Sequence, residues 1–530
     1  MLVLRFSKTL TLFSATAALA FAAIYVPPAD QQAAKKKKAK APAASQTKST
    51  GTKTGSPQAK APAKQQPQVK SAQTKSLPKA APVITSQKAQ PKPPAAKPAI
   101  ASAKPQTSTA AVPKTAVKRT TVRPAMISAK DRAAGQDFVF QNASTAADIP
   151  VERSAALIPF FEQLYRHQKG ESPGPIRILH YGDSHTAADE WTGDLRSHFQ
   201  EKFGDGGAGY SLPGKPFIGY RHNDIRTSST RGWHTDGLVG KPAGDGIYGL
   251  GGVSMSARMP REAVYLDAEA SMFELFYYQQ PDGGTIQIYD NGTPLERVST
   301  AGDPGPAYYH FEAIPGQHRL ELETVDKGPV RLFGWVAEKP TGVTYEPLGI
   351  NGAQASIVFD WNETTLRSNI ERRDPALIVL AYGTNEAGRK DITLESYRAM
   401  FTELIAKFRR AAPAATILVV GPPDRDVRTR RGTWEPIDAL DIIVQAQREA
   451  AAAQGCPFWD LRAKMGGKGS MQQWVNAGMA QYDHVHFTAP GYRRLGYTLF
   501  RDLMYNYEKY TKVREELARA DSHVETSSDH

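Results

Sequence analysis

The spacing of apolar positions after about residue 150 predicts alternating strands and helices. Short, mainly apolar runs, typical of buried strands, lie at 176–181, 376–382, 416–420 and 457–460. Apolar residues three and four positions apart predict helices at about 155–167, 184–203, 394–410, 437–453 and 490–509. Strands that alternate with helices form parallel βαβ units, so this part of the chain predicts a doubly wound α/β domain with helices on both faces of its sheet.

A different pattern interrupts this rhythm between residues 213 and 339. Short alternating runs separated by Pro-Asp-Gly-Gly, Asn-Gly and Pro-Gly turns lie at 271–279, 285–290, 307–313, 318–325 and 330–337. They predict an antiparallel β-sandwich at 213–339, inserted between the first and second strands of an α/β domain that occupies 131–212 and 340–510. We expect residues 511–530 to form a disordered tail.

The first 30 residues predict an export sequence. Arg5 and Lys8 precede an uncharged run, Thr9 to Val26, that is rich in Ala and Leu and ends at Pro27-Pro28. Small residues in this run offer Ala-x-Ala cleavage sites, and its 18 residues are also sufficient for a retained membrane anchor. Both outcomes place the protein outside the cytoplasm, in the periplasm or on the envelope.

Residues 31–130 carry the basic charge of the chain. They contain 19 Lys, two Arg, no Asp or Glu and no aromatic residue. Of the net charge of +13, this segment supplies +21 and residues 1–30 supply +1, which leaves −9 on residues 131–530. A segment so poor in apolar surface is expected to be a disordered linker, either a spacer or an adhesive for anionic polymers and lipid. A globular nucleic-acid-binding domain is excluded, because the folding part is acidic.

The first candidate for chemistry is Gly182-Asp183-Ser184-His185, at the carboxyl end of a predicted strand and the start of a predicted helix. Doubly wound sheets place their sites at this edge. A serine there exposes its hydroxyl, and its N–H points toward a developing oxyanion. The same tetrapeptide is equally typical of a helix N-cap.

The second candidate is Asp483-His484-Val485-His486, before the last predicted helix. A serine nucleophile needs a base, and the base needs an acceptor for its other ring nitrogen; Asp483 and His486 supply both from one loop. Metal ligation by His484, His486 and an Asp is the alternative. A second His-rich motif is lacking nearby, and the single cysteine, Cys456, excludes a multi-cysteine zinc site or an intramolecular disulfide.

Two glycine-rich turns complete the set. Asn385, in Tyr382-Gly-Thr-Asn-Glu386, follows a predicted buried strand, and its side chain is a candidate oxyanion donor. The N–H of Gly352, in Gly349-Ile-Asn-Gly-Ala353, is another. Ordinary turn chemistry also explains either segment.

Taken together and in this order, the four motifs resemble the SGNH (GDSL-like) hydrolase family. The resemblance implies a flavodoxin-like α/β/α fold, with Ser184 as nucleophile, His486 as base and Asp483 orienting it. It also implies oxyanion donation by the N–H groups of Ser184 and Gly352 and by the side chain of Asn385, without a metal or other cofactor.

Two departures from the family pattern narrow the resemblance. Glu386 stands where many members have Asp, and His185 where the GDSL name expects Leu. Together with the predicted inserted β-sandwich, these two residues make the sequence similar to the branch of the family that contains bacterial peptidoglycan O-acetylesterases. In that branch the inserted module resembles a carbohydrate-binding jelly roll.

The resemblance and the export sequence together lead to an expected function. We expect an exported serine esterase that removes O-acetyl groups from a cell-wall or envelope glycan, in particular peptidoglycan. One alternative is an esterase or acyltransferase acting on another envelope or secreted polysaccharide, since the fold is the same whether water or a sugar hydroxyl meets the acyl-enzyme. Another is a non-catalytic wall-binding protein, against which the complete set of triad and oxyanion residues argues.

Overall fold

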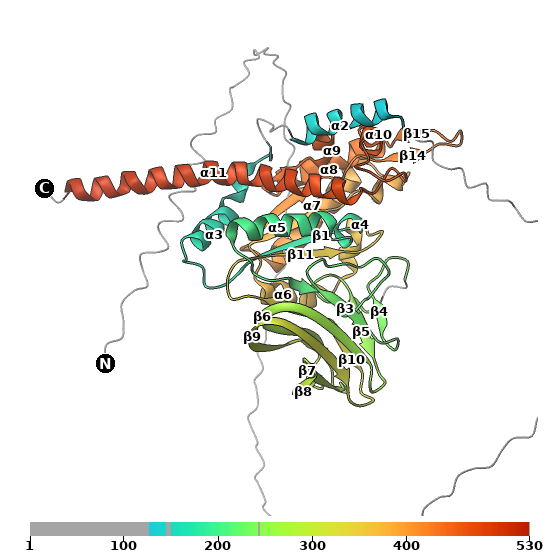
Figure 1. The fold of residues 1–530 in the computed structure, drawn as a ribbon, viewed down its shortest axis with the longest axis vertical. Helices are drawn as coiled ribbons and strands as arrows, with labels where there is room; N and C mark the ends of the chain where they lie inside the picture. The colour runs from blue at the N-terminus through green and yellow to red at the C-terminus, as the bar shows by residue number, and fades with distance from the viewer. Residues whose placement is uncertain (1–126, 145–149, 242–243, 529–530) are drawn as a thin grey trace, which may run out of the picture. The chain divides into compact units, whose positions relative to one another are not determined.

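The computed structural model describes residues 127–144, 150–241 and 244–528 (Figure 1). The export sequence predicted at 1–30 and all but the last few residues of the linker predicted at 31–130 lie outside the described residues. Among the helices that are described, none has the length and apolar character that crossing a membrane requires.

The centre of the hydrolase part is a five-stranded parallel sheet. In chain order its strands are β1 (Ile176–Gly182), β11 (Val343–Gly349), β12 (Leu377–Ala381), β13 (Thr416–Val420) and β16 (Phe458–Trp459). They lie in the spatial order β11-β1-β12-β13-β16, the doubly wound order of flavodoxin-like sheets. Strand order reverses at β1, so the crevice where such sheets bind ligands opens beside the carboxyl end of this strand.

Strand β11 is missing from the sequence-based prediction. Its sequence, Val-Thr-Tyr-Glu-Pro-Leu-Gly, interrupts the apolar run with Thr344, Glu346 and Pro347. Thr344 and Glu346 are nevertheless fully buried, because Arg373 pairs with the Glu346 carboxylate and the Thr344 hydroxyl donates to it at 3.0 Å. The compensated charge permits a polar sequence to form a buried strand.

Helices cover both faces of this sheet, as predicted. One face packs against α6 (Glu363–Arg373), α7 (Leu394–Ala411) and α8 (Ala439–Ala453). The other packs against α3 (Ile158–Gln168), α5 (Glu190–Phe203) and α11 (Ala489–Ser528). Successive residues of β1 alternate between the two cores: Ile178 contributes to the α5 side, and Leu179 and Tyr181 contribute to the α7 side. This part also contains the helix α2 (Ala129–Ser144) and several short elements: η1 (Ser154–Leu157), η2 (Ala355–Asp360), η3 (Glu386–Gly388), α9 (Leu461–Met465) and α10 (Met471–Asn476).

The insert is a nine-stranded antiparallel sheet between β1 and β11 in sequence. Its strands are β2 (Gly209–Ser211), β3 (Arg226–Ser229), β4 (His234–Asp236), β5 (Ser254–Ala257), β6 (Ala263–Gln279), β7 (Thr285–Asp290), β8 (Thr293–Ser299), β9 (Gly305–Thr324) and β10 (Val330–Glu338). The runs predicted separately at 307–313 and 318–325 are one strand, β9, which pairs with β6 along its length with a register shift between Ala270 and Met272. The sheet has its own apolar core, whereas the two-layered sandwich stays a prediction.

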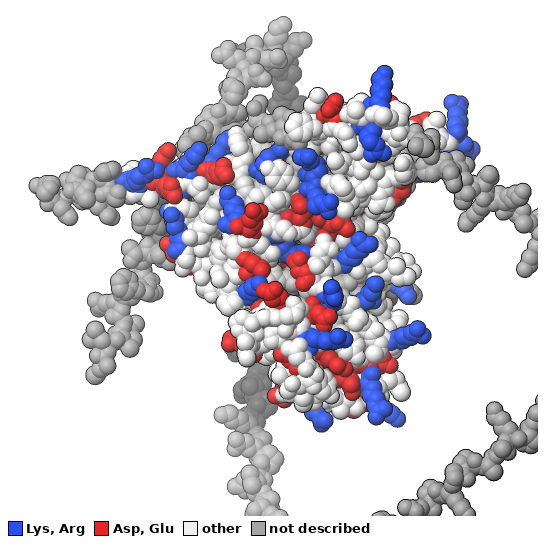
Figure 2. All heavy atoms as spheres, viewed as in Figure 1, with Lys and Arg blue, Asp and Glu red and all other residues white. Residues whose placement is uncertain are grey.

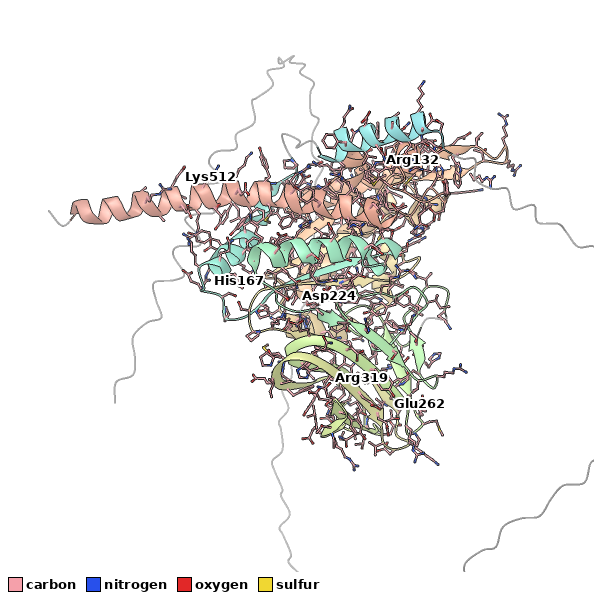
Figure 3. All side chains as sticks on the ribbon, viewed as in Figure 1. Arg132, His167, Asp224, Glu262, Arg319 and Lys512 are labelled. Atoms are coloured by element: carbon pink, nitrogen blue, oxygen red, sulfur yellow. The ribbon has the colours of Figure 1, made fainter. Side chains whose placement is uncertain are left out.

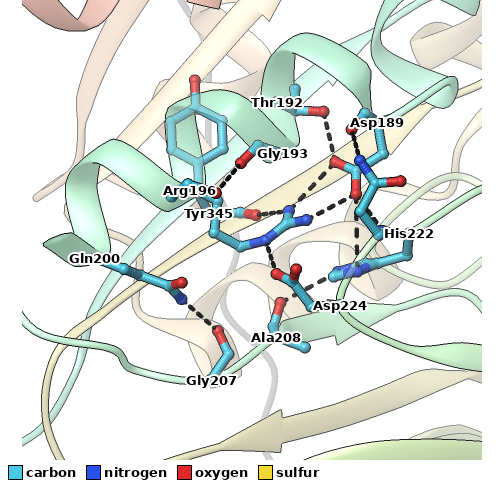
Figure 4. A network of polar contacts seen from close by, with 12 residues as sticks. Asp189, Thr192, Gly193, Arg196, Gln200, Gly207, Ala208, His222, Asp224 and Tyr345 are labelled. Atoms are coloured by element: carbon cyan, nitrogen blue, oxygen red, sulfur yellow. Dashed lines mark hydrogen bonds and ion pairs between the residues drawn. The ribbon is translucent and has the colours of Figure 1, made fainter. Parts of the chain in front are cut away.

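A buried polar network joins the hydrolase part to the first loop of the insert (Figure 4). Arg196 of α5 pairs with Asp189 at 2.7 Å and with Asp224 of the loop, and donates to the carbonyl of Tyr345 at 2.9 Å. Asp189 also accepts from the N–H of Asn223 at 2.6 Å. Removing one partner would leave a buried charge uncompensated, so this network fixes the loop firmly to α5 and β11.

The single helix predicted at 184–203 is in fact two helices, and the chain is interrupted between them at Asp189. Asp189 has a left-handed backbone, with φ of 50°, and it separates the one-turn helix α4 (Ser184–Ala187) from α5. The break lets its carboxylate reach Arg196 and the hydroxyl of Thr192, at 2.7 Å.

The disordered tail predicted at 511–530 is also wrong for residues 511–528, because α11 continues through Ser528. Lys512, labelled in Figure 3, lies on this extension. Residues 512–520 are rich in Glu, Arg, Ala and Leu, which are strong helix formers. Arg514 also pairs with Glu162 of α3 at 3.0 Å, so tertiary contact supports the added turns.

Candidate functional site

The ends of β1 and β11 bring the Gly182–His185 and Gly349–Ala353 motifs together. The strands pair in register up to Gly182 and Gly349, and the N–H of Ile350 donates to the carbonyl of Gly182 at 3.1 Å. A Cβ at Gly182 would lie 2.3 Å from the Thr186 hydroxyl and 2.8 Å from a β12 carbonyl, so only glycine fits there. The chain then turns into α4, whose first residue is Ser184.

Ser184, His486 and Asp483 form one hydrogen-bonded chain. The Ser184 hydroxyl lies 3.0 Å from Nε2 of His486, and Nδ1 of His486 lies 2.7 Å from Oδ2 of Asp483. With the proton on Nδ1, the imidazole donates to the carboxylate and accepts from the serine. Oδ1 of Asp483 accepts from the N–H groups of Val485 and His486, each at 3.0 Å, which fixes the carboxylate within its own loop.

The electrostatics of this pair suit a general base. The hydrogen bond to Asp483 raises the pKa of His486 above its ordinary value of 6.5, against the opposing effect of burial. Burial acts to raise the pKa of Asp483, but the hydrogen bonds donated to it outweigh burial and hold that pKa well below its usual range. Asp483 is therefore ionised at neutral pH, and it stabilises the imidazolium that forms when His486 takes a proton.

Asn385 and Gly352 meet at the same edge of the sheet. Nδ2 of Asn385 donates to the carbonyl of Ala353 at 2.9 Å and lies 3.5 Å from Oδ2 of Asp183. Gly352, next to Ala353, is exposed and has a left-handed backbone with φ of 77°. Within the described residues the Gly352 N–H has no intramolecular hydrogen bond, which leaves it available to an oxygen in the crevice.

Glu386 has a structural part in this edge that the sequence pattern did not reveal. Its carboxylate accepts from the N–H of Ala355 at 2.8 Å and from the hydroxyl of Tyr397 at 3.1 Å. It thereby ties the strand end that carries Asn385 to the turn that carries Gly352. Burial raises the pKa of Glu386 to about 7.

His185 packs against the imidazole of His486. Its ring centroid lies 5.3 Å from that of His486, and its Nδ1 bonds to the hydroxyl of Tyr492 at 2.9 Å. Burial lowers the pKa of His185 to about 4, so the ring is neutral at physiological pH. An uncharged neighbour does not oppose formation of the His486 imidazolium.

His484, which the sequence offered as a metal ligand, faces a different carboxylate from His486. Its Nδ1 lies 2.7 Å from Oδ2 of Asp426, and its ring stacks on Trp434 with centroids 4.0 Å apart and planes 12° apart. Its backbone is left-handed, with φ of 56°, a conformation that a non-glycine residue keeps only when its surroundings hold it there. In the part of the chain that the structure describes, no group of three His, Cys, Asp or Glu side chains is arranged to hold a metal ion.

Arg425 is a further residue that sequence reasoning missed. Its guanidinium donates to the carbonyl of Thr384 at 2.6 Å and interacts electrostatically with Asp183 and Asp483. It thus connects the Asn385 strand end with the Asp483 loop. Only the tertiary fold reveals this, because nothing in the local sequence relates residue 425 to either motif.

A serine hydroxyl, an imidazole and a carboxylate linked in this order at the carboxyl edge of a parallel sheet define the site of a serine esterase of α/β/α fold. The model of the GDSL-like lipase/acylhydrolase family matches residues 322–494. The match begins after most of the insert, so it includes Gly352, Asn385, Asp483 and His486 but not Ser184. The geometry and the match together support an esterase of the SGNH type.

One solved structure agrees with this assignment. A structure entitled "Peptidoglycan O-acetylesterase in action, 5 min" is 29% identical, with a TM-score of 0.58, and the match covers 66% of this chain and 96% of that one. A family two carbohydrate esterase from Clostridium thermocellum is 13% identical over 52% of this chain and 98% of that one, with a TM-score of 0.24. One from Cellvibrio japonicus is 11% identical over 54% and 98%, with a TM-score of 0.23. The similarity of these two structures to this chain is too low to support a conclusion about its fold or function. Curated protein sequences gave no match.

Proposed function

We propose that this protein is an exported esterase that removes O-acetyl groups from an envelope glycan, and that the glycan is peptidoglycan. The observation that carries the reaction is the linked chain of Ser184, His486 and Asp483. The substrate is supported by the likeness to the peptidoglycan O-acetylesterase structure, at 29% identity. Export rests on the uncharged run between Lys8 and Pro27.

In the proposed mechanism Ser184 attacks the acetyl carbonyl while Nε2 of His486 takes the serine proton. The tetrahedral oxyanion accepts hydrogen bonds from the N–H groups of Ser184 and Gly352 and from Nδ2 of Asn385. Collapse of the intermediate expels the sugar oxygen, which receives the proton held by His486. Water activated by the same imidazole then hydrolyses the acetyl-serine to acetate and free enzyme.

The remaining segments have proposed roles around this reaction. Residues 31–130 would act as a tether that keeps the esterase near the wall. The inserted sheet would contribute contacts to the glycan.

The test is acetate release from O-acetylated peptidoglycan by the purified protein, compared with its Ser184→Ala variant. We expect release by the wild type and a loss of at least about 10³-fold in the variant. Acetylated xylan and 4-nitrophenyl acetate are run in parallel. Activity on the small ester alone would keep the site but discard the glycan, and activity on xylan alone would select another polysaccharide. Inactivity on all three would favour acyl transfer or wall binding without catalysis.

A further inference from the structure

A short hairpin projects beside the candidate site. It consists of β14 (Asp426–Arg428) and β15 (Trp434–Pro436), with Asp426 opposite Pro436 and Arg428 opposite Trp434. Figure 1 places it at the end of the hydrolase part near α10, away from the inserted sheet. The hairpin contributes nothing to the parallel sheet or to the buried cores, apart from the residues at its base.

The base of the hairpin is fixed to the loop that carries Asp483 and His486. Asp426 holds His484 twice, through Oδ2 to Nδ1 at 2.7 Å and through its N–H to the His484 carbonyl at 3.1 Å. Trp434 stacks on one face of the same imidazole. Since His484 lies between Asp483 and His486 in sequence, the hairpin cannot move without moving this loop.

The tip of the hairpin carries three exposed cations. Arg428, Arg430 and Arg431 are all exposed, and in the described residues none of them forms an ion pair. Strand geometry of about 3.3 Å per residue places the Cα of Arg428 some 7 Å from that of Asp426, which holds His484 in the loop of Asp483 and His486. Lys and Arg side chains project at this end of the molecule in Figure 2.

This patch stands out against the rest of the folded region. Residues 131–530 carry a net charge of −9. Some exposed arginines elsewhere are compensated, as Arg410 is by Glu363 and Glu403. Others, such as Arg226, Arg231 and Arg258 of the insert, form no ion pair among the described residues either, but they do not lie on the hairpin that holds the loop of Asp483 and His486. Three uncompensated guanidinium groups on a rigidly held tip suit a multiply anionic ligand, and their planar forks match the two oxygens of a carboxylate.

We propose that Arg428, Arg430 and Arg431 bind carboxylates of the acylated polymer, and that the hairpin is thereby a substrate-recognition element. The inference rests on the proposed function, which supplies a glycan whose peptide stems bear carboxylates. A neutral acetylated polysaccharide would have nothing for this tip to bind. Substrate specificity then has two sources. The acyl site binds the ester, and the hairpin binds the carboxylates that lie near it on the polymer.

The experiment compares two substrates and three full-length proteins. The substrates are O-acetylated peptidoglycan in its native form and after its carboxylates have been converted to neutral amides with a carbodiimide and ethanolamine. The proteins are the wild type, R428Q/R430Q/R431Q, and R166Q/R258Q/R367Q, which removes the same charge from exposed positions on α3, after β5 and on α6. The basic segment 31–130 is identical in all three proteins, so its effect cancels.

We expect the wild type and the control variant to prefer native over amidated substrate by roughly fivefold in kcat/KM, a preference that weakens as salt is added. The hairpin variant should lose most of this preference through a lower kcat/KM on the native substrate, and keep only the part that segment 31–130 contributes to all three proteins. Equal preference in all three proteins would overturn the inference, as would an equal loss by the hairpin variant on both substrates.

Binding separates this inference from the proposed function. Sedimentation of the same three proteins, each also carrying Ser184→Ala, with native and amidated wall polymer measures recognition without acetate release. Absence of release by the wild type would reject the proposed function, whereas absence of a hairpin-dependent binding difference would reject the inference. Hairpin-dependent binding to vesicles containing phosphatidylglycerol, with none to the wall polymer, would also reject it in favour of a lipid surface.

Discussion

Two histidines lie two residues apart on one loop, and Nδ1 of each is 2.7 Å from an aspartate carboxylate, that of Asp483 in the same loop for His486 and that of Asp426 on β14 for His484. The pair of His486 and Asp483 is open, with side chains 36% and 45% exposed, and the second imidazole nitrogen faces Ser184. The pair of His484 and Asp426 is closed, at 4% and 3%, and lies under Trp434. The same two functional groups therefore serve chemistry in one place and architecture in the other.

The two pairs differ in whether the imidazole can exchange a proton with another group. His486 can pass a proton between a serine and an incoming molecule because one side of its ring is accessible. His484 has no such freedom, since its ring face, its Nδ1 and its backbone carbonyl are all engaged. Variants on the open pair should change rate, and variants on the closed pair should change stability first.

The largest expected effect is that of His486→Gln. Glutamine keeps the approximate size of the side chain but cannot take the serine proton, so kcat should fall by about 10⁵-fold, with the melting temperature almost unchanged. Initial rates on 4-nitrophenyl acetate and a thermal melt measure both. A comparable loss of rate from His484→Gln in a fully folded protein would erase the distinction between the two pairs.

Asp483→Asn should follow, with a loss of roughly 10³- to 10⁴-fold in kcat. In the wild type the base form of His486 appears only above its raised pKa, so kcat/KM should rise with pH through a midpoint above 6.5. Removing the carboxylate removes the main cause of the raised pKa, and the midpoint should move to lower pH. A pH–rate profile checks the sign, and an unchanged midpoint would mean that Asp483 does not set the basicity of His486.

Asp426→Ala should act mainly on stability. It leaves the buried Nδ1 of His484 without a partner, which costs about 1–3 kcal/mol of the free energy of unfolding. Denaturant titration measures the cost, and Asp426→Asn should recover part of it because the amide oxygen still accepts a hydrogen bond. If the alanine variant keeps wild-type stability, His484 does not depend on this carboxylate.

The smallest effect is expected from Trp434→Leu. Leucine retains apolar cover over His484 but loses the ring stacking, a change of about 0.5–1.5 kcal/mol. Activity should fall only a few-fold, through greater motion of the loop. The measurement is the ratio of kcat in this variant and in the wild type at several temperatures, and a ratio that does not vary with temperature would argue against a mobile loop.

Much of the fold could be predicted from the sequence because four of the five parallel strands coincide with short, mainly apolar runs. Strand β11 could not, since the burial of Glu346 depends on Arg373, a residue on another helix. The break after α4 was equally hidden: the left-handed backbone of Asp189 follows from its contacts with Arg196 and the loop at Asn223, which no local pattern records.

The candidate site shows the same division. The four short motifs were visible because each groups its functional residue types within four or five consecutive positions, and the fold brings them to one edge of the sheet. The supports of the site were not visible, since Asp426, Trp434 and Arg425 acquire meaning only through the residues they contact in three dimensions. Short sequence motifs therefore predict the reacting residues better than they predict the residues that hold them in position.

The position of the insert also bears on how the molecule is synthesised. Strand β1 lies between β11 and β12 in the sheet, yet the chain makes more than 150 residues before either neighbour emerges. Growing from the N-terminus, the polypeptide can first close the local hairpins of β6 to β10, whereas β1 must wait unpaired with its apolar side chains exposed. Ser184 is therefore synthesised early, but the sheet and the His486 base that complete its site are synthesised much later. The esterase site cannot form until the chain has been made through His486.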